Sequence, residues 1–520
     1  MSTQLFNRDD VEAAAALADI PFSNPFGLRR REIERQILGN AYVEPARSLL
    51  PGEPLHQLEG NLGGLMQRAD GLMAGMLERI GSRATVAARD REIAEGLAHL
   101  IVFHRRAHDF DGLISPAGEV EGARPGRTSA GSLFERCRRD LEGLIGHPAL
   151  RLDVAARAPT WFAMYFQIRR TWVHTYAFIR GGSTEIRSLR ERIWQSIFTH
   201  DMRRYQRSLH ARMGDITTLI SGPSGSGKEL VARAIGLSRF VPFDVRERGF
   251  AADFAASFHP LNLSALSPTL IESELFGHRR GAFTGALGDR VGFFEICGEH
   301  GTVMLDEVGE TAPEIQVKLL RVLQTRQFNR LGDTELRRFR GRVVAATNRD
   351  LAAEIEAGRF REDFFFRLCG DKIETPALRD VLAGDPEELR CLVAHICAAQ
   401  AGREEAADLT RQVLEVIDCQ LGSSYAWLGN FRELEQCVRN IVVHGSYVPP
   451  LVARRGGQSW LENARSSRLT MDELLQGYCR LVADESGSLE EAARRLGADR
   501  RTVRRYLKMS EKTPEGGRIP

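Results

Sequence analysis

The sequence predicts a multidomain protein with a mainly α N-terminal domain, a central α/β core on a parallel sheet, and helical units on the C-terminal side. Three observations predict this class. The 520 residues allow three or four compact units at about 150 residues each. Apolar residues follow a helical spacing in residues 1–190, whereas residues 191–375 alternate short β-branched runs with helical stretches. A composition of 43% hydrophobic and 27% charged residues excludes a disordered or fibrous chain.

The N-terminal domain is predicted from segments such as HQLEGNLGGLMQRADGLMAGMLERI and RDREIAEGLAHLIVFHRRA. Their apolar residues recur every three or four positions, which indicates amphipathic helices. Glycine, proline and serine are frequent from Gly112 to Ser132, so we expect a long loop there.

The α/β core is predicted from five short apolar runs, each followed by a helical stretch. Such alternation is typical of a parallel sheet flanked by helices. The runs are ITTLIS from 216, HPLNLS from 259, TVMLD from 302, VVAATN from 343 and KIET from 372. Beyond this core we expect a helical domain at 376–445, a linker at 446–468 and a small helical unit at 469–512.

Several classes of protein are excluded by what the sequence lacks. It has no apolar stretch long enough to span a membrane and no basic-then-apolar start, so we expect a cytoplasmic protein without membrane attachment. Eight cysteines without a C-x-x-C pair favour reduced thiols over a disulfide framework. A net charge of +2 indicates that any nucleic-acid-binding surface is local.

A glycine-rich segment between a predicted strand and a predicted helix indicates a phosphate site. It has the pattern G-x-x-x-x-G-K, in which backbone N–H groups and a helix N-terminus surround a phosphate and the lysine reaches its oxygens. Only five of the 71 basic residues are lysines, and Lys228 is one of them. The lysine would reach the β and γ oxygens of the bound phosphates. The candidate residues are Gly222, Pro223, Ser224, Gly225, Ser226, Gly227, Lys228 and Glu229.

Acidic residues after a later strand complete this site. Glu229 stands where the pattern usually has a hydroxyl that binds magnesium, so Mg²⁺ requires another ligand. Asp306 would hold Mg²⁺ through its waters, and Glu307 would orient or deprotonate the attacking water. Asn348, after the next strand, could contact the γ-phosphate. All three lie at the carboxyl edge of the predicted sheet, where α/β proteins bind ligands.

These motifs resemble those of the AAA+ ATPases, and a further stretch resembles the bacterial enhancer-binding proteins that activate RNA polymerase carrying sigma-54. Glu272-Ser-Glu-Leu-Phe-Gly-His278 is followed by the hexapeptide GAFTGA. In this family that hexapeptide is the loop that contacts sigma-54. Its two glycines suit a loop that changes shape and projects an aromatic tip. The residues so assigned are Gly281, Ala282, Phe283, Thr284, Gly285 and Ala286.

The resemblance also implies roles for four other residues. Arg361 and Arg367 lie in a segment similar to the family's arginine finger, which enters the site of a neighbouring subunit. Arg432 matches the lid arginine that senses nucleotide, although Leu428 replaces the usual proline. Asn262 matches the asparagine that holds the catalytic glutamate. The resemblance covers about residues 195–445 and, separately, the C-terminus.

The C-terminal unit resembles the Fis-type helix-turn-helix of the same family. Thr470-Met-Asp-Glu473 is a predicted capping box, and two short helices around Gly497 follow it. Seven basic and three acidic residues lie between Leu489 and Lys508. We expect the second helix to contact DNA. The candidate contacts are Arg500, Arg501, Thr502, Arg504 and Arg505.

Two N-terminal clusters have competing interpretations. His104 and His108, with Asp109 and Asp111, could bind a metal, but a solvated face is the favoured interpretation. The aromatic run from Trp161 to Trp172 could line a ligand pocket, but core packing or a dimer interface is favoured. The signal that this domain receives is not predicted.

Taken together, the resemblance implies an ATPase that forms a ring, expected to be a hexamer, and binds upstream, enhancer-like DNA. It would remodel the closed complex of the sigma-54 RNA polymerase holoenzyme into an open complex. One alternative is a DNA-bound regulator that binds nucleotide without productive ATPase activity. A second alternative is an AAA+ protein that remodels a target other than polymerase.

Overall fold

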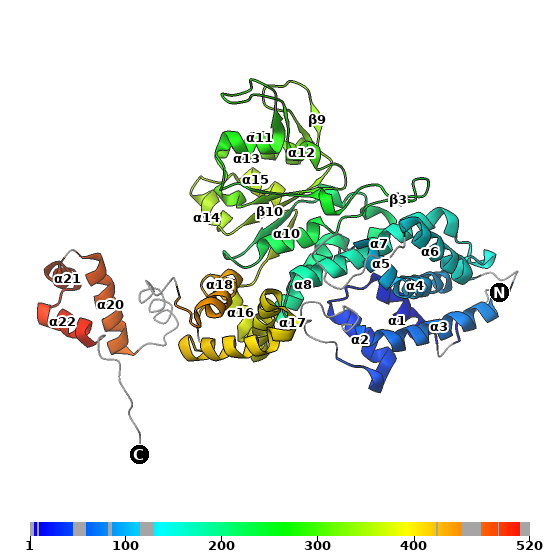
Figure 1. The fold of residues 1–520 in the computed structure, drawn as a ribbon, viewed down its shortest axis with the longest axis horizontal. Helices are drawn as coiled ribbons and strands as arrows, with labels where there is room; N and C mark the ends of the chain where they lie inside the picture. Colours follow the sequence, from blue (N-terminus) through cyan, green and yellow to red (C-terminus); the bar gives the residue numbers. More distant parts are fainter. Residues whose placement is uncertain are drawn as a thin grey trace, which may run out of the picture. The chain divides into compact units, whose positions relative to one another are not determined.

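The computed structural model describes residues 5–7, 10–44, 59–81, 86–114, 129–422, 425–449, 470–486 and 488–509. The chain divides into two compact units, Met1–Ser446 and Tyr447–Pro520 (Figure 1). Most of the predicted linker at 446–468 lies outside the described residues. No helix in the described ranges has the length and apolar character that crossing a membrane requires.

The N-terminal part of the first unit is helical, as predicted. The predicted loop from Gly112 to Ser132 is helical at both ends, and residues 115–128 lie outside the described residues. The main helices are α1 (Val11–Asp19), α2 (Leu28–Leu38), α3 (Leu62–Arg79), α4 (Ala88–Arg105), α5 (Ala107–Ile114), α6 (Ala130–Ile145), α7 (Val154–Phe178) and α8 (Thr184–Phe198).

The centre of the first unit is a five-stranded sheet with the order β11-β1-β10-β7-β4. All four pairings are parallel, so every strand ends at the same edge of the sheet. The five predicted strands are thereby confirmed. They are β1 (Thr218–Ser221), β4 (Phe258–Asn262), β7 (Thr302–Asp306), β10 (Arg342–Thr347) and β11 (Asp371–Glu374).

Alternate residues of these strands enter two different cores, because successive side chains of a strand point to opposite faces. Val344 and Ala346 of β10 pack in the core that contains α10 (Lys228–Gly236). Val343 and Ala345 pack in the other core, with residues of α13 (Pro313–Thr325) and α15 (Glu362–Leu368). The sheet is therefore covered on both faces.

The N-terminal helices and the sheet share one continuous hydrophobic core. Strands β2 (Phe243–Asp244) and β3 (Gly249–Phe250) form a hairpin that packs on α7. The ring centroids of Phe162 and Phe243 are 4.8 Å apart, and those of Phe166 and Phe250 are 4.1 Å apart. The favoured interpretation of the aromatic run, core packing, is confirmed for these rings. The expected boundary between residues 190 and 191 falls inside α8 (Thr184–Phe198).

The predicted helical domain at 376–445 consists of three helices after β11. These are α16 (Leu378–Ala383), α17 (Pro386–Gln420) and α18 (Asn430–His444). Helix α17 is interrupted at Gly402, whose φ of 78° no helix accommodates. We call α16–α18 the lid.

Two short hairpins and several short elements were not predicted from the sequence. Helix α11 (Pro268–Phe276) leads into β5 (Gly277–His278), which pairs with β6 (Arg290–Val291). Strand β8 (Gln327–Phe328) pairs with β9 (Arg337–Arg338). Strands of two residues carry too little periodicity to be recognised in a sequence. The other short helices in this part are α12 (Phe293–Ile296) and α14 (Leu351–Glu356).

The second unit contains α20 (Met471–Glu485), α21 (Leu489–Leu496) and α22 (Arg500–Met509). The predicted capping box of Thr470 and Glu473 is present. Gly497 ends α21 in the left-handed conformation, and Ala492, Ala493 and Val503 are buried in this unit.

Candidate nucleotide site and its neighbouring loops

The phosphate loop connects β1 to α10 at the carboxyl edge of the sheet. Gly222, Gly225 and Gly227 have φ angles of 152°, 74° and 85°, which side chains disfavour. A Cβ at Gly225 would lie 2.3 Å from the carbonyl oxygen of Gly429, so the lid also requires glycine there. The glycines of the loop are therefore required by its backbone conformation and, at Gly225, also by the close approach of the lid.

Lys228 is the first residue of α10, and its side chain is buried beneath this loop. Its Nζ donates hydrogen bonds to the carbonyl oxygens of Gly222 at 3.1 Å and Pro223 at 3.0 Å. Burial lowers the pKa of Lys228, whereas Glu307 and Asp306 act to raise it. The ammonium thus lies within the electrostatic reach of both carboxylates.

Asp306 ends β7, and Glu307 follows in the left-handed conformation with a φ of 53°. Such a conformation is uncommon for a residue with a side chain and is concentrated at functional sites. Burial, and then the charge of Glu307, raise the pKa of Asp306, and Lys228 opposes this shift. The pair places two carboxylates beside the lysine, which is the arrangement that metal-assisted phosphoryl transfer needs.

Two asparagines contact this acid pair. The backbone N–H of Asn348 donates to Oε2 of Glu307 at 3.2 Å, so Asn348 joins the site through its backbone as well as its exposed side chain. Nδ2 of Asn262 lies 3.4 Å from Oδ2 of Asp306. The resemblance implies a contact of Asn262 with Glu307, whereas the structure places Asn262 against Asp306, because β4 and β7 pair Asn262 directly with Asp306.

The start of the lid is bonded to the phosphate loop. Nδ2 of Asn430 donates to the carbonyl of Ser224 at 2.9 Å, and the N–H of Phe431 donates to the carbonyl of Gly225 at 3.1 Å. Arg432 lies next to these two residues and lines the same pocket. Sequence reasoning found Arg432 but missed Asn430, whose positive φ of 55° and buried amide are visible only in the structure.

The pocket around the loop has a volume of about 500 Å³. Lys228, Asp306, Glu307, Asn262 and Arg432 line it. Its apolar side was not predicted, because the contributing residues come from α7, α8 and the lid, which are remote in sequence. These residues include Phe178, Ile179, Ile186, Leu189, Leu392, Ile396 and Phe431.

Two titratable residues complete the apolar side. Burial lowers the pKa of Arg180 to about 10 and the pKa of His395 to about 4. Arg180 also acts to lower the pKa of His395, so the two side chains are close. His395 is therefore neutral at pH 7, and its ring can both donate and accept a hydrogen bond.

The two candidate finger arginines do not line this pocket. Arg361 precedes α15 and forms an ion pair with Asp363 of its own chain at 2.7 Å. Arg367, in the last turn of α15, is exposed, and its side chain has no hydrogen bond or ion pair within the part of the chain that the structure describes. The two arginines are thus exposed on the surface of the first unit.

The GAFTGA segment forms a closed loop between β5 and β6. The N–H of Gly281 donates to the carbonyl of Ala286 at 2.9 Å, and Gly281 and Gly285 have φ angles of 80° and 105°. The expected projecting aromatic tip is not observed. Phe283 is half-buried, and its ring packs edge to face on His278 at 5.0 Å, so Thr284 is the exposed side chain.

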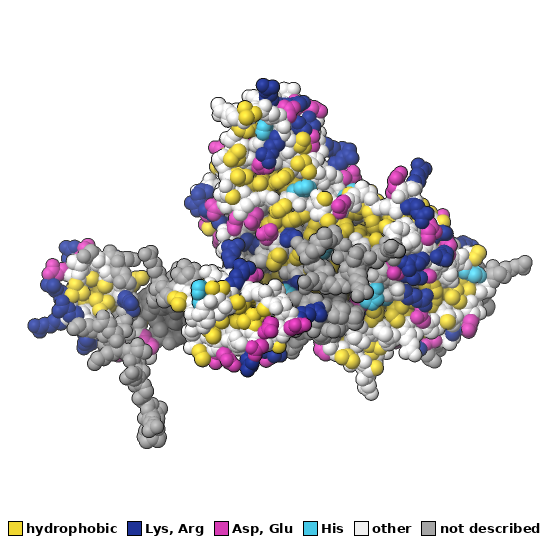
Figure 2. Space-filling view, viewed as in Figure 1, with side chains coloured by type: hydrophobic (Ala, Val, Ile, Leu, Met, Phe, Trp, Pro, Cys, Tyr) yellow, Lys and Arg dark blue, Asp and Glu magenta, His cyan; other side chains and the backbone are white. Residues whose placement is uncertain are grey.

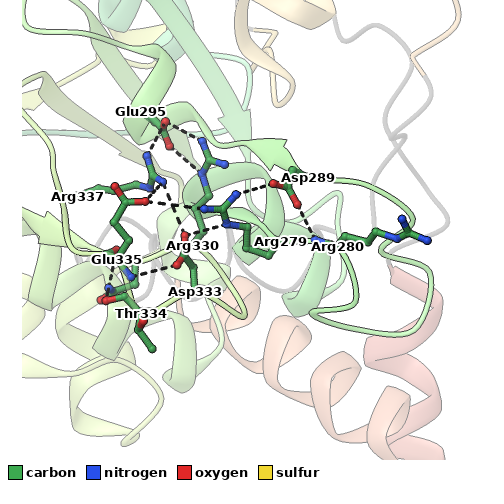
Figure 3. Close-up of polar contacts among 10 residues, drawn as sticks. Arg279, Arg280, Asp289, Glu295, Arg330, Asp333, Thr334, Glu335 and Arg337 are labelled. Carbon is green, nitrogen blue, oxygen red and sulfur yellow. Dashed lines mark hydrogen bonds and ion pairs between the residues drawn. The ribbon is translucent and has the colours of Figure 1, made fainter.

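A network of charged residues fixes this loop to the hairpin of β8 and β9 (Figure 3). Arg279 forms ion pairs with Asp289 at 2.6 Å and Asp333 at 3.1 Å. Glu295 accepts from Arg330 at 2.7 and 3.0 Å and from Arg337 at 3.0 Å. Each arginine contacts a carboxylate from another segment, so the two hairpins are held as one body.

The five candidate DNA-contacting residues all lie on α22. Two of them already have side-chain partners in their own chain. Arg500 pairs with Glu490 at 2.5 Å, and the hydroxyl of Thr502 donates to Asp499 at 2.7 Å. Arg501, Arg504 and Arg505 are exposed. Basic side chains gather over the helices of this unit in Figure 2.

The less favoured interpretation of His104 and His108, a metal site, is not supported by the described residues. No group of three or more potential ligands occurs among the described residues. Asp109 pairs with Arg136 at 3.3 Å, and Asp111 pairs with Arg169 at 2.7 Å, so both carboxylates belong to ion pairs.

The parallel sheet, the phosphate loop after β1, the acid pair after β7 and the lid together define a P-loop nucleotide-binding domain of the AAA+ class. Residues 197–374 match the family model described as the Sigma-54 interaction domain. The chain therefore carries this domain, and its resemblance to the bacterial enhancer-binding proteins is confirmed there.

Known proteins are similar over about half of the chain. The hydrogenase transcriptional regulatory protein HoxA of Bradyrhizobium diazoefficiens is 42% identical over 252 residues, which cover 47% of each chain. The transcriptional regulatory protein ZraR of Escherichia coli K12 is 37% identical over 297 residues, or 56% of this chain and 62% of ZraR. The chain thus spans between about half and two thirds of these relatives.

A crystal structure of NtrX from Brucella abortus in complex with ATP aligns at 26% identity. The alignment covers 68% of this chain and 74% of NtrX, with a TM-score of 0.38. A score this low does not indicate a common arrangement of the two whole chains.

Proposed function

We propose that the protein is a sigma-54-dependent transcriptional activator that hydrolyses ATP and binds DNA through its C-terminal unit. The observation that carries this proposal is the presence, on one domain, of Lys228 beside the Asp306–Glu307 pair and of an intact GAFTGA loop held by the network of Figure 3. The first feature can bind and hydrolyse a nucleotide, and the loop can pass the resulting conformational change to a partner protein.

ATP fits the pocket by chemistry and by size. The phosphate loop and Lys228 supply N–H groups and a cation for the phosphates, and the apolar side formed by Ile179, Leu189 and Phe431 can cover the base. Mg²⁺ would neutralise phosphate charge, and Asp306 would hold it, since Glu229 offers no hydroxyl. Glu307 would orient the attacking water. The N–H of Asn348 holds the Glu307 carboxylate in place for this role.

The contact of Asn262 with Asp306 supports a route from the nucleotide to the GAFTGA loop. Asn262 ends β4, and the following α11 leads directly into β5 and the loop. A change in charge at Asp306 would act on Asn262 and then shift α11. Phe283 would leave His278 during this step, which converts a packed loop into a projecting one.

The exposed position of Arg367 supports assembly into a ring. A guanidinium on the outside of its own protomer can enter the pocket of a neighbour and neutralise charge on the γ-phosphate. We therefore propose a homo-oligomeric ring, with a hexamer as the expected form.

The C-terminal unit would bind upstream DNA with Arg501, Arg504 and Arg505 of α22. Helix α20 exposes Met471, Leu474, Leu475 and Tyr478, which lie three and four residues apart and hence on one helix face. We propose that this face pairs two C-terminal units, so that each dimer reads two half-sites.

The decisive experiment measures ATPase activity and open-complex formation with sigma-54 holoenzyme for the wild type and Thr284→Ala. The variant is expected to retain ATPase activity and lose open-complex formation. A wild-type protein without ATPase activity would favour a nucleotide-binding DNA regulator. ATPase activity without sigma-54 binding in the presence of a transition-state analogue would favour a remodeller of another target.

A further inference from the structure

Two polar side chains on the apolar side of the nucleotide pocket have no partner in the described part of the chain. Arg180 is half-buried, and its guanidinium forms no hydrogen bond or ion pair there. Nδ1 of His395 is buried and has no hydrogen-bond partner either. Buried polar groups in proteins are normally hydrogen-bonded, so both side chains indicate a ligand that supplies the missing partners.

The two residues come from different parts of the fold. Arg180 lies in the turn between α7 and α8, and His395 lies in α17 of the lid. The backbone N–H of Gly182, two residues after Arg180, donates to Oε2 of Glu388 at 2.9 Å. Glu388 precedes His395 by about two turns of α17, so these two residues lie on the same face of the helix. The contact therefore holds the turn of Arg180 against the helix of His395.

Arg180 lies away from the phosphate end of the pocket. Among the described residues, Arg190 is the charged group that acts on the pKa of Arg180, whereas the pKa of Lys228 responds to both carboxylates of the acid pair. Arg180 is therefore beyond the electrostatic reach of that pair and of the phosphate loop. The neighbours of Arg180 and His395 along the chain that also line the pocket are apolar, namely Ile179, Leu392 and Ile396.

The two side chains differ in hydrogen-bonding character. A guanidinium has five N–H donors and no acceptor. Burial, and then the charge of Arg180, lower the pKa of His395 to about 4, so its ring is neutral and keeps one accepting nitrogen. Together Arg180 and His395 can offer a donor and an acceptor to one ligand. Adenine matches this pair, because its amino group donates and the neighbouring ring nitrogens accept.

We propose that Arg180 and His395 select adenine as the base of the bound nucleotide. Nδ1 of His395 would accept from the amino group at C6, and Arg180 would donate to a ring nitrogen beside that group. A base with a carbonyl oxygen at C6, such as hypoxanthine or guanine, would place an acceptor against an acceptor and leave both unpaired. The inference rests on the proposed function of the pocket as an ATP site and names the residues that set its base specificity.

Base selection is tested by comparing ATP with inosine triphosphate, which has a carbonyl oxygen in place of the amino group. Both affinities are measured by titration calorimetry on the full-length protein without Mg²⁺, so that neither nucleotide is hydrolysed. We expect the wild type to bind ATP about 10-fold more tightly than inosine triphosphate. Equal affinity for the two nucleotides overturns the proposal.

Variants of His395 separate base reading from packing. His395→Leu should weaken ATP binding about 10-fold and change the affinity for inosine triphosphate little, so the ratio of the two affinities falls toward one. His395→Asn is the matched variant, because its Oδ1 is an acceptor at the side-chain position that Nδ1 occupies, and it should keep most of the ratio. An equal loss of affinity for both nucleotides in His395→Leu would show a packing role only and would contradict the assignment.

Variants of Arg180 separate the base from the phosphates. Arg180→Met should weaken ATP binding about 10-fold and leave the affinity for inorganic tripolyphosphate unchanged, because tripolyphosphate has no base. Arg192→Met changes an exposed arginine of α8 that does not line the pocket, and it should affect neither ligand. A matching loss of tripolyphosphate affinity in Arg180→Met would assign Arg180 to the phosphates and reject its role at the base. Normal tripolyphosphate binding also verifies that each variant is folded.

A failure of the proposed function gives a different result from a failure of base selection. If the pocket is not a nucleotide site, the wild type binds neither ATP nor tripolyphosphate, and both proposals are overturned. If the pocket binds nucleotides without reading the base through these residues, Lys228→Ala weakens ATP and tripolyphosphate binding while the variants of Arg180 and His395 keep the wild-type affinities. That second result overturns base selection alone.

Discussion

The backbone N–H of Gly182 donates to both carboxylate oxygens of Glu388, at 3.0 and 2.9 Å. Gly182 lies in the turn between α7 and α8, and Glu388 lies near the start of α17 in the lid. The preceding Gly181 has a φ of 105°, which side chains disfavour, and a Cβ there would lie 2.0 Å from Oε1 of Glu388. This contact joins the N-terminal helices to the lid without passing through the sheet.

Replacing Glu388 by Gln should destabilise the first unit by about 1–3 kcal/mol, because a buried charged hydrogen bond is lost. Chemical denaturation followed by circular dichroism measures the change. The matched control is Glu387→Gln, whose exposed ion pair with Arg390 is worth at most about 1 kcal/mol. Equal stability of the two variants would show that the contact contributes nothing.

Glu307→Gln should retain ATP binding and lose about 10²–10⁴-fold in turnover, because an amide orients water but cannot take its proton. Nucleotide binding measured with a fluorescent analogue and phosphate release separate the two effects. Glu310→Gln is the control, since Glu310 follows Glu307 closely in the chain but forms an ion pair with Arg349. Normal turnover of Glu307→Gln would reject its assigned role.

Arg367→Ala should lower turnover about 10³-fold or more while nucleotide binding survives. Arg361→Ala should have the smaller effect, because Arg361 is paired with Asp363 in its own chain. Mixing Arg367→Ala with Lys228→Ala protomers tests the shared site. Mixed rings contain some intact interfaces and should regain activity, whereas sites built within one protomer would give none.

Glu295→Gln should loosen the β8–β9 hairpin from α12, the helix that follows β6, because it weakens contacts with both Arg330 and Arg337. We expect near-normal ATPase activity and reduced open-complex formation, both measured on the same preparation. Glu299→Gln changes only an exposed pair with Arg340 and is the control. A parallel loss of ATPase activity in Glu295→Gln would indicate a general structural effect instead.

The stability of the first unit should fall in acid because of His174. Burial lowers the pKa of this histidine to about 3, so the unfolded state, with a pKa near 6.5, binds the extra proton between these values. Stability therefore rises with pH through this window, and the loss attributable to His174 is about 2 kcal/mol at pH 5. His174→Gln should reduce this slope in urea denaturation and leave the curves parallel above pH 7.

The sequence by itself determined the five core strands, the phosphate loop, the acid pair and the capping box of Thr470. These features depend on local patterns: alternation of apolar runs, glycines at fixed spacing before a lysine, and a hydroxyl three residues before a glutamate. Such patterns act over a few residues and are therefore visible in the chain alone.

Tertiary structure alone decided the rest. It placed Asn262 against Asp306, folded Phe283 onto His278 and merged the N-terminal helices with the sheet into one core. It also brought Ile179, Leu392 and Phe431 together as one wall of the nucleotide pocket. The physical reason is that burial and side-chain contact depend on how separate segments pack in space, and no local spacing encodes which surfaces will meet.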